Sequence, residues 1–267
     1  MPNAVINVSS FLGDGTQSFF LAQINTAMLS VGFSLLDSYT SGGGYRVWNF
    51  NTGGNFTYSN LCLQFGFSNA TTSCGIRGYS NWNTSTKTGD NPSAIAGSAI
   101  ASLAAAYTLY SINHLEVRGV FVVEGTTQRF FIGYFRPDTS LPANSWYNEN
   151  QSPLAYIATS TGLTDFSANN AVLQSISSLR AQSGLSNVGF TQQISTSGNF
   201  STGNTRVLFP ATITTSTGET IHVFSPDVAL CGASGLTILD YFTVDTKRYT
   251  FFNGVNTTTA KLFVRTA

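Results

Sequence analysis

The segment 114–135 constrains the fold of this chain more than any other. Its first half, 114–124, and its second half, 128–135, are both rich in β-branched and aromatic residues, which favour strands. The three residues Gly125-Thr126-Thr127 lie between the halves, and their composition is typical of a turn. Pro137 follows the second half and ends it. The segment therefore predicts a long antiparallel β-hairpin.

More strands are predicted on both sides of this hairpin. Towards the N-terminus, short apolar and aromatic segments are separated by the glycine-rich turns 41–44 and 51–54, a pattern that indicates an antiparallel meander. After Gly184 the chain shows strand patterns alone. The predicted N-terminal strands are 33–39, 45–50, 61–67 and 76–82, and the later ones are 187–194, 206–208, 211–215, 220–224, 236–244, 248–252 and 261–265.

Three segments favour helices. Apolar residues recur at helical spacing over 16–31, with Thr16 able to cap the start and Gly32 following the end. The alanine-rich segment 93–106 and the segment 169–180 are further candidates. The sequence thus predicts an α+β fold, predominantly antiparallel β with two or three helices packed on the sheets. We expect an N-terminal α+β region over 1–165 and a C-terminal, mostly β region over 166–267, with a single intermixed domain as the alternative.

Charge is scarce in this chain, and its scarcity excludes several functions. Charged residues make up 9% of the sequence, and twelve Lys and Arg balance twelve Asp and Glu. No basic stripe is present, so binding to nucleic acid through charge is not expected. The sequence contains no apolar run of the length that a membrane-spanning helix needs. No basic, apolar leader is seen at the N-terminus, so we expect synthesis in the cytoplasm without a secretion signal.

No pattern of catalytic residues or metal ligands stands out. His114 and Glu116 alternate along a predicted strand, where a solvent-exposed strand face is the simpler interpretation. Cys231, His222 and Asp227 are close in sequence but lack the spacing of a zinc site. The nucleophile elbow and the phosphate-binding loop are both absent. We therefore expect no enzymatic activity, no metal and no cofactor. Cys62 and Cys74 are expected as buried thiols, with a disulfide between them as the alternative.

Three aromatic residues flanked by Asn are the best candidates for a binding surface. They are Trp82, Trp146 and Tyr147. An aromatic ring among short polar side chains can stack on a sugar, and it is equally typical of the anchor of a protein–protein interface. The sequence favours packing in a core or an interface over a glycan site.

Several segments resemble parts of structural proteins from tailed bacteriophage virions, in the loose family of tail, baseplate and fibre-associated proteins. The segments that carry the resemblance are spread over most of the chain. They are the helix end at Val31-Gly32-Phe33, the run Tyr45-Arg46-Val47-Trp48, the Phe-Gly-Phe of strand 61–67, the hairpin end at 131–135 and the strand-turn-strand at 240–252. The resemblance implies a virion part that is not an enzyme, and no functional residues follow from it.

The working hypothesis is a non-catalytic virion structural protein, located in the virion as a tail or baseplate component. Its partners would be other virion proteins or copies of itself, and affinity would come from apolar burial because charge is scarce. The hairpin 114–135 was expected to offer an unguarded edge for such contacts. The alternatives are a module that recognises a host surface glycan and a capsid decoration protein; a hydrolase ranks last.

Overall fold

The computed structural model describes residues 3–40, 43–51, 60–69, 72–79, 81–90, 96–135, 154–159, 171–175, 188–190, 209–210, 212–215, 220–223, 226–232, 237–252 and 260–267. In these ranges the strand pairings that build the sheets are antiparallel. The prediction of a predominantly antiparallel β fold is therefore confirmed. The prediction of two or three helices is wrong for the described ranges, which contain one α-helix.

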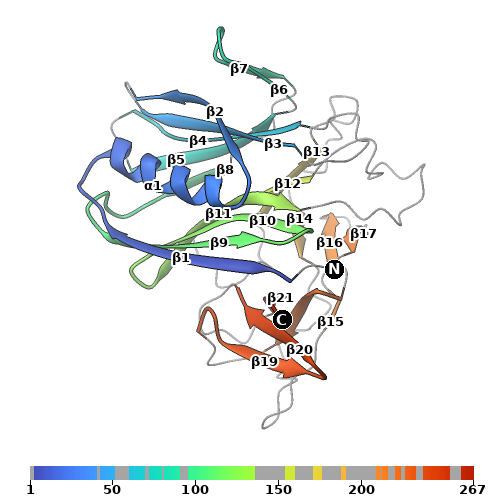
Figure 1. The fold of residues 1–267 in the computed structure, drawn as a ribbon. Helices are drawn as coiled ribbons and strands as arrows, with labels where there is room; N and C mark the ends of the chain where they lie inside the picture. The colour runs from blue at the N-terminus through green and yellow to red at the C-terminus, as the bar shows by residue number, and fades with distance from the viewer. Residues whose placement is uncertain are drawn as a thin grey trace.

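Two large sheets enclose the main hydrophobic core (Figure 1). The six-stranded sheet has the order β1-β9-β10-β11-β12-β13, and the five-stranded sheet has the order β2-β3-β4-β5-β8. The strands of the first are β1 (Val5–Leu12), β9 (Ala106–Asn113), β10 (Val117–Glu124), β11 (Thr127–Phe135), β12 (Leu154–Thr159) and β13 (Ala171–Ser175). Those of the second are β2 (Ser34–Tyr39), β3 (Tyr45–Asn51), β4 (Asn60–Phe67), β5 (Ser73–Tyr79) and β8 (Ala96–Ala99).

The helix α1 (Gln17–Ser30) packs into this core, as its sequence predicts. The Thr16 hydroxyl accepts a hydrogen bond from the Phe19 amide at 3.3 Å and so caps the helix. Gly32 follows the helix with a φ of 93°, a conformation that suits glycine best. The residues that the helix buries are Phe20, Leu21, Ile24, Ala27 and Met28.

The two other predicted helices are replaced by strands where the structure describes them. Within 93–106, β8 pairs with β5 through Gly75 opposite Gly97, and short side chains let these backbones approach closely. Within 169–180, residues 171–175 form β13 beside β12. Both errors have the same cause, because helix propensity is worth a few tenths of a kcal/mol per residue and the pairing partner decides the outcome.

The predicted central hairpin is confirmed as β10 and β11, with a bulge between Val122 and Val123. Smaller sheets complete the molecule. One is the hairpin of β6 (Asn81–Asn83) and β7 (Thr88–Asp90). A three-stranded sheet has the order β14 (Val188–Phe190), β16 (Thr212–Thr215), β17 (Thr220–Val223). The C-terminal sheet of five strands has the order β15 (Phe209–Pro210), β18 (Val228–Gly232), β21 (Ala260–Arg265), β20 (Lys247–Phe251), β19 (Tyr241–Val244).

The C-terminal sheet contacts the six-stranded sheet through aromatic rings. The Phe252 ring lies 6.1 Å from the Phe121 ring and 6.2 Å from the Phe131 ring, measured between centroids. Strand β13 lies after the predicted boundary at residue 165 but belongs to the six-stranded sheet. The division into two regions stays a prediction.

Candidate functional site

The structure places one of the three predicted aromatic residues. Trp82 lies in β6 and is only 7% exposed, so it packs within the molecule, and its role in an interface or a glycan site stays a prediction. Trp146 and Tyr147 lie outside the described residues. The neighbouring Asn81 and Asn83 are exposed, because alternation along β6 turns them away while Trp82 points to the sheet. Local sequence polarity was therefore a poor guide to this side chain.

Trp82 covers part of the face of the five-stranded sheet that is turned away from the core, here called the outer face. It packs there against Val47, Cys62 and Tyr79, and the Tyr79 ring lies edge-on to it at 5.1 Å. Gly89 of β7 lies beneath the same Tyr79 ring, where a Cβ atom would come within 2.1 Å of it. The β6–β7 hairpin, here called the lid, thus covers about one half of the outer face through aromatic packing.

A bulge in β2 brings a carboxylate to this lid. The register between β2 and β3 shifts between Leu35 and Asp37, so Leu36 is an extra residue. Leu35 is paired with Trp48, which points to the core, whereas Asp37 is paired with Val47 on the outer face. In a regular strand Leu36 would pair with Val47 and Asp37 with Arg46, and alternation would then direct Asp37 to the core.

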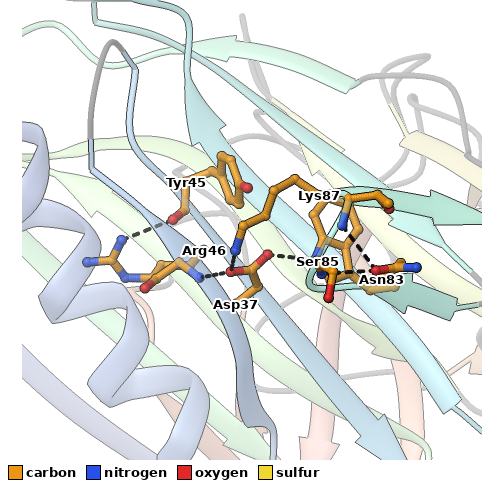
Figure 2. Close-up of polar contacts among 9 residues, drawn as sticks. Asp37, Tyr45, Arg46, Asn83, Ser85 and Lys87 are labelled. Atoms are coloured by element: carbon orange, nitrogen blue, oxygen red, sulfur yellow. Dashed lines mark hydrogen bonds and ion pairs between the residues drawn. The ribbon is translucent and has the colours of Figure 1, made fainter.

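Asp37 joins the sheet to the lid through three hydrogen bonds. Its Oδ2 accepts from the Trp82 indole Nε1 at 2.8 Å, and its Oδ1 accepts from Lys87 Nζ at 2.5 Å and from the Ser38 amide at 2.8 Å. Figure 2 shows Lys87 reaching over from the hairpin to this carboxylate. Burial of Asp37 opposes its ionisation, but the bonds from Lys87, Trp82 and Ser38 outweigh burial and hold the pKa of Asp37 below its usual value.

The turn of the hairpin positions the Lys87 ammonium. Asn83 Oδ1 accepts hydrogen bonds from the amides of Ser85 at 2.9 Å and Thr86 at 3.1 Å, which closes the turn (Figure 2). Lys87 follows with a φ of 57°, an unusual left-handed conformation for a residue with a side chain. The sequence of the turn gives no sign of this geometry, because the partner carboxylate lies fifty residues away.

The uncovered half of the outer face forms an open groove of about 290 Å³. Three glycines, one on each of β4, β5 and β8, pair across the sheet and continue a row that begins with Tyr39 and Tyr45. Tyr45, Gln64 and Arg77 rise around this floor. The glycines of the row are Gly66, Gly75 and Gly97.

The sequence predicts His114 on a solvent-exposed strand face, and this prediction is wrong. It precedes β10, it is 2% exposed, and its Nδ1 accepts from the Glu116 amide at 3.2 Å. Its Nε2 has no hydrogen-bond partner among the described residues. Burial lowers the pKa of His114, although the nearby Asp227 carboxylate acts in the opposite direction. The side chains of Cys231 and His222 lie outside the description, and Cys62 and Cys74 are buried free thiols rather than a disulfide.

The unguarded sheet edge lies elsewhere than predicted. β10 lies between β9 and β11, and β11 lies between β10 and β12, so neither strand of the central hairpin is an edge. β1 and β2 are the edges of the two sheets on the side where α1 packs (Figure 1). Eight consecutive uncharged residues form β1. Exposed apolar side chains on these elements are Val5, Val8, Leu12, Leu29, Leu35, Leu36 and Tyr39.

No protein-family model matches the chain, and no curated protein matches it. Within the described ranges, no three His, Cys, Asp or Glu side chains gather where they might hold a metal ion. The helix found in that part of the chain falls short of the length and apolarity needed to cross a membrane.

Proposed function

We propose that this chain is a non-catalytic structural protein of a tailed bacteriophage virion, a tail or baseplate component that works by assembly. Its partners are other virion proteins and further copies of itself. The observation that supports this most is β1, which is uncharged along its whole length and borders the six-stranded sheet with exposed apolar side chains.

An edge strand of this kind is suited to pairing with another chain. Its outer amides and carbonyls form a template for a further strand, and soluble proteins commonly protect such edges with charge, proline or a bulge. β1 contains neither charge nor proline, and its pairing with β9 is regular over all eight residues. Val8 is 48% exposed and Leu12 is 71% exposed, so a neighbouring strand would cover apolar surface as well.

The resemblance to virion proteins and the low charge support the same function. Contacts built from apolar burial and strand pairing keep their strength when salt changes, which suits a part fixed among neighbours. A capsid decoration protein would use the same edge, and the place of the chain in the particle distinguishes the two. Recognition of a host glycan is favoured by a separate observation, the groove on the outer face, which is treated below.

Sedimentation velocity of the purified protein tests the role of β1. We expect self-association at low salt and at about 1 M salt alike, because the Debye length falls to about 3 Å while apolar contacts persist. Val8→Lys should abolish it, and Val244→Lys on β19, at a similarly exposed valine, should not. A wild-type monomer under both conditions, together with a solvent-exposed β1 in a reconstruction of the particle, would refute the proposal.

A further inference from the structure

We propose that the groove on the outer face of the five-stranded sheet binds a sugar ring of a surface glycan. This inference goes beyond the assembly function and does not depend on β1, which belongs to the other sheet. It rests on three features of the groove: a flat glycine floor, an aromatic wall, and polar groups at the rim.

The floor is flat because the two residues of the row that form it, Gly66 and Gly75, carry no side chains. Gly66 on β4 pairs with Gly75 on β5, and Gly75 pairs with Gly97 on β8. Glycine in a strand interior weakens the sheet, so three glycines in one row are costly unless something must approach the backbone closely. The first of them is also required by packing, since a Cβ atom on Gly66 would come within 2.6 Å of the Tyr45 Cβ.

Tyr45 forms the wall at the end of the glycine row. Tyr39 stacks on it with ring centroids 5.5 Å apart and planes inclined by 20°. Trp82 meets it edge-on at 6.1 Å, so the ring is held from two sides. Tyr45 lines the groove and Tyr39 does not, which places the groove at the face of Tyr45 opposite the stack. A fixed aromatic face beside a flat floor suits the apolar face of a sugar ring.

The polar groups of the rim match the oxygens of such a ring. Arg77 and Gln64 are neighbours across β5 and β4, and both line the groove. Tyr79 donates to Gln64 Oε1 at 2.8 Å, which orients that amide. The guanidinium of Arg77 lies 6.0 Å from the centroid of the same Tyr79 ring. Arg77 is the single charged residue among the lining residues, and a guanidinium donates to hydroxyls and pairs with carboxylates.

The volume limits the occupant to a small group. About 290 Å³ is at the lower end of the roughly 300–1,000 Å³ typical of small-molecule sites. One ring of an oligosaccharide fits this space, and the open shape leaves the rest of a chain in solvent. A neutral sugar and a sugar acid share the ring that stacks on Tyr45; they differ in whether Arg77 meets a hydroxyl or a carboxylate.

The test is a titration of the purified full-length chain with maltotriose and with trigalacturonate, followed by NMR of the tryptophan indole protons. Trp82 touches Tyr45 on the outer face, whereas Trp48 lies in the core. We expect one of these sugars to shift the Trp82 signal and to leave the Trp48 signal in place. Tyr45→Leu should weaken binding about tenfold, a change of about 1.4 kcal/mol. Arg77→Gln should weaken trigalacturonate binding about fivefold or more and affect maltotriose less.

Matched substitutions in the C-terminal sheet serve as controls. Tyr241 is 59% exposed and Arg248 lies 3.8 Å above its ring, so Tyr241→Leu and Arg248→Gln remove the same chemistry elsewhere. Both should leave binding unchanged. Gly75→Val fills the floor, keeps an extended strand and should abolish binding while the Trp48 signal reports an intact core. The inference is overturned if neither sugar shifts Trp82 at about 10 mM, well above a Kd of 1 mM, or if binding survives both Tyr45→Leu and Gly75→Val.

Discussion

The two faces of the five-stranded sheet are each covered around a tryptophan, but by different means. On the core side, Trp48 is fully buried, and its indole Nε1 donates to Asn25 Oδ1 of α1 at 2.8 Å. On the outer face, Trp82 donates to Asp37 Oδ2 at the same distance. The first belongs to a cluster of twenty buried residues from two sheets and a helix, the second to a cluster of four.

This difference distinguishes the side of the sheet that the fold requires from the side that can open locally without unfolding. The core side depends on apolar packing contributed by elements from the whole N-terminal half, so its loss is the loss of the fold. The outer face depends on a short hairpin and one carboxylate, so it can open locally while the sheets persist. The groove on the outer face lies beside the cover that opens more easily.

The largest effect is expected on the core side. Ile24→Ala removes a fully buried side chain from α1 and should lower the free energy of unfolding by about 2–5 kcal/mol. Leu29→Ala on the same helix is the control, because Leu29 is 46% exposed; it should cost less than about 0.5 kcal/mol. Urea denaturation measures both. Similar values for the two variants would contradict the packing described for α1.

A smaller and local effect is expected from Asp37→Asn. The amide keeps an acceptor for Trp82 but loses the charge that meets Lys87, so we expect the hairpin to open more easily by about 1–3 kcal/mol. Hydrogen exchange of amides in β6 and β7 should accelerate, while exchange in β9 and β10 stays slow. Asp240→Asn, which alters a half-buried carboxylate bonded to the Thr237 amide, is the matched control. Uniform acceleration across all strands would show that the hairpin does not open on its own.

The labelling rates of the two buried thiols test the same difference between the core side and the outer face. Burial raises the pKa of Cys62 to about 11 and that of Cys74 to about 12, so neither should react readily near neutral pH. Cys62 lies under the hairpin and Cys74 lies in the core. In a Cys231→Ser background, Asp37→Asn should raise the labelling rate of Cys62 about tenfold and leave Cys74 unchanged. Equal acceleration at both thiols would place the opening in the core instead.

The smallest effect is expected from pH. The folded pKa of Asp37 is below its usual value of about 3.9, so its ionised form stabilises the lid above that pH and the contribution is lost as pH falls through the folded pKa. The Trp82 indole signal should change in this acidic range, whereas the Trp48 signal should not, because Asn25 does not titrate. Lys87→Gln should move the Trp82 change to higher pH. A change that is unaffected by this substitution would assign the titration to another group.

Local sequence predicted those parts of the fold that local interactions decide. The helix α1 was predicted with its cap and its buried face, because its periodicity, Thr16 and Gly32 agree with one another. The segment at β8 is predicted as a helix from its alanine content and the segment at β13 from its apolar spacing, and only the partner strands β5 and β12 reverse these predictions. The central hairpin was predicted, but its neighbours β9 and β12 were needed to show that it is not an edge.

The candidate site was less accessible to prediction from sequence. Trp82 was noticed for its polar neighbours, yet its environment is set by Asp37, Val47 and Cys62, which are distant in sequence. The glycines of the groove floor become a row only when the register of three strands is known. Register depends on the pairing of whole strands, so single residues could not reveal it.

The extra residue in β2 marks a point at which the strand tolerates a change of chain length. Substitutions at Leu36 leave the parity of the strand unchanged, so Asp37 stays opposite Val47 whatever side chain replaces the leucine. Deleting Leu36 would remove the bulge and leave a regular strand, in which Asp37 follows Leu35 directly, stays opposite Val47 and keeps Tyr39 opposite Tyr45. Related chains can therefore lose this residue by one codon and keep the lid, the groove wall and the core of the sandwich.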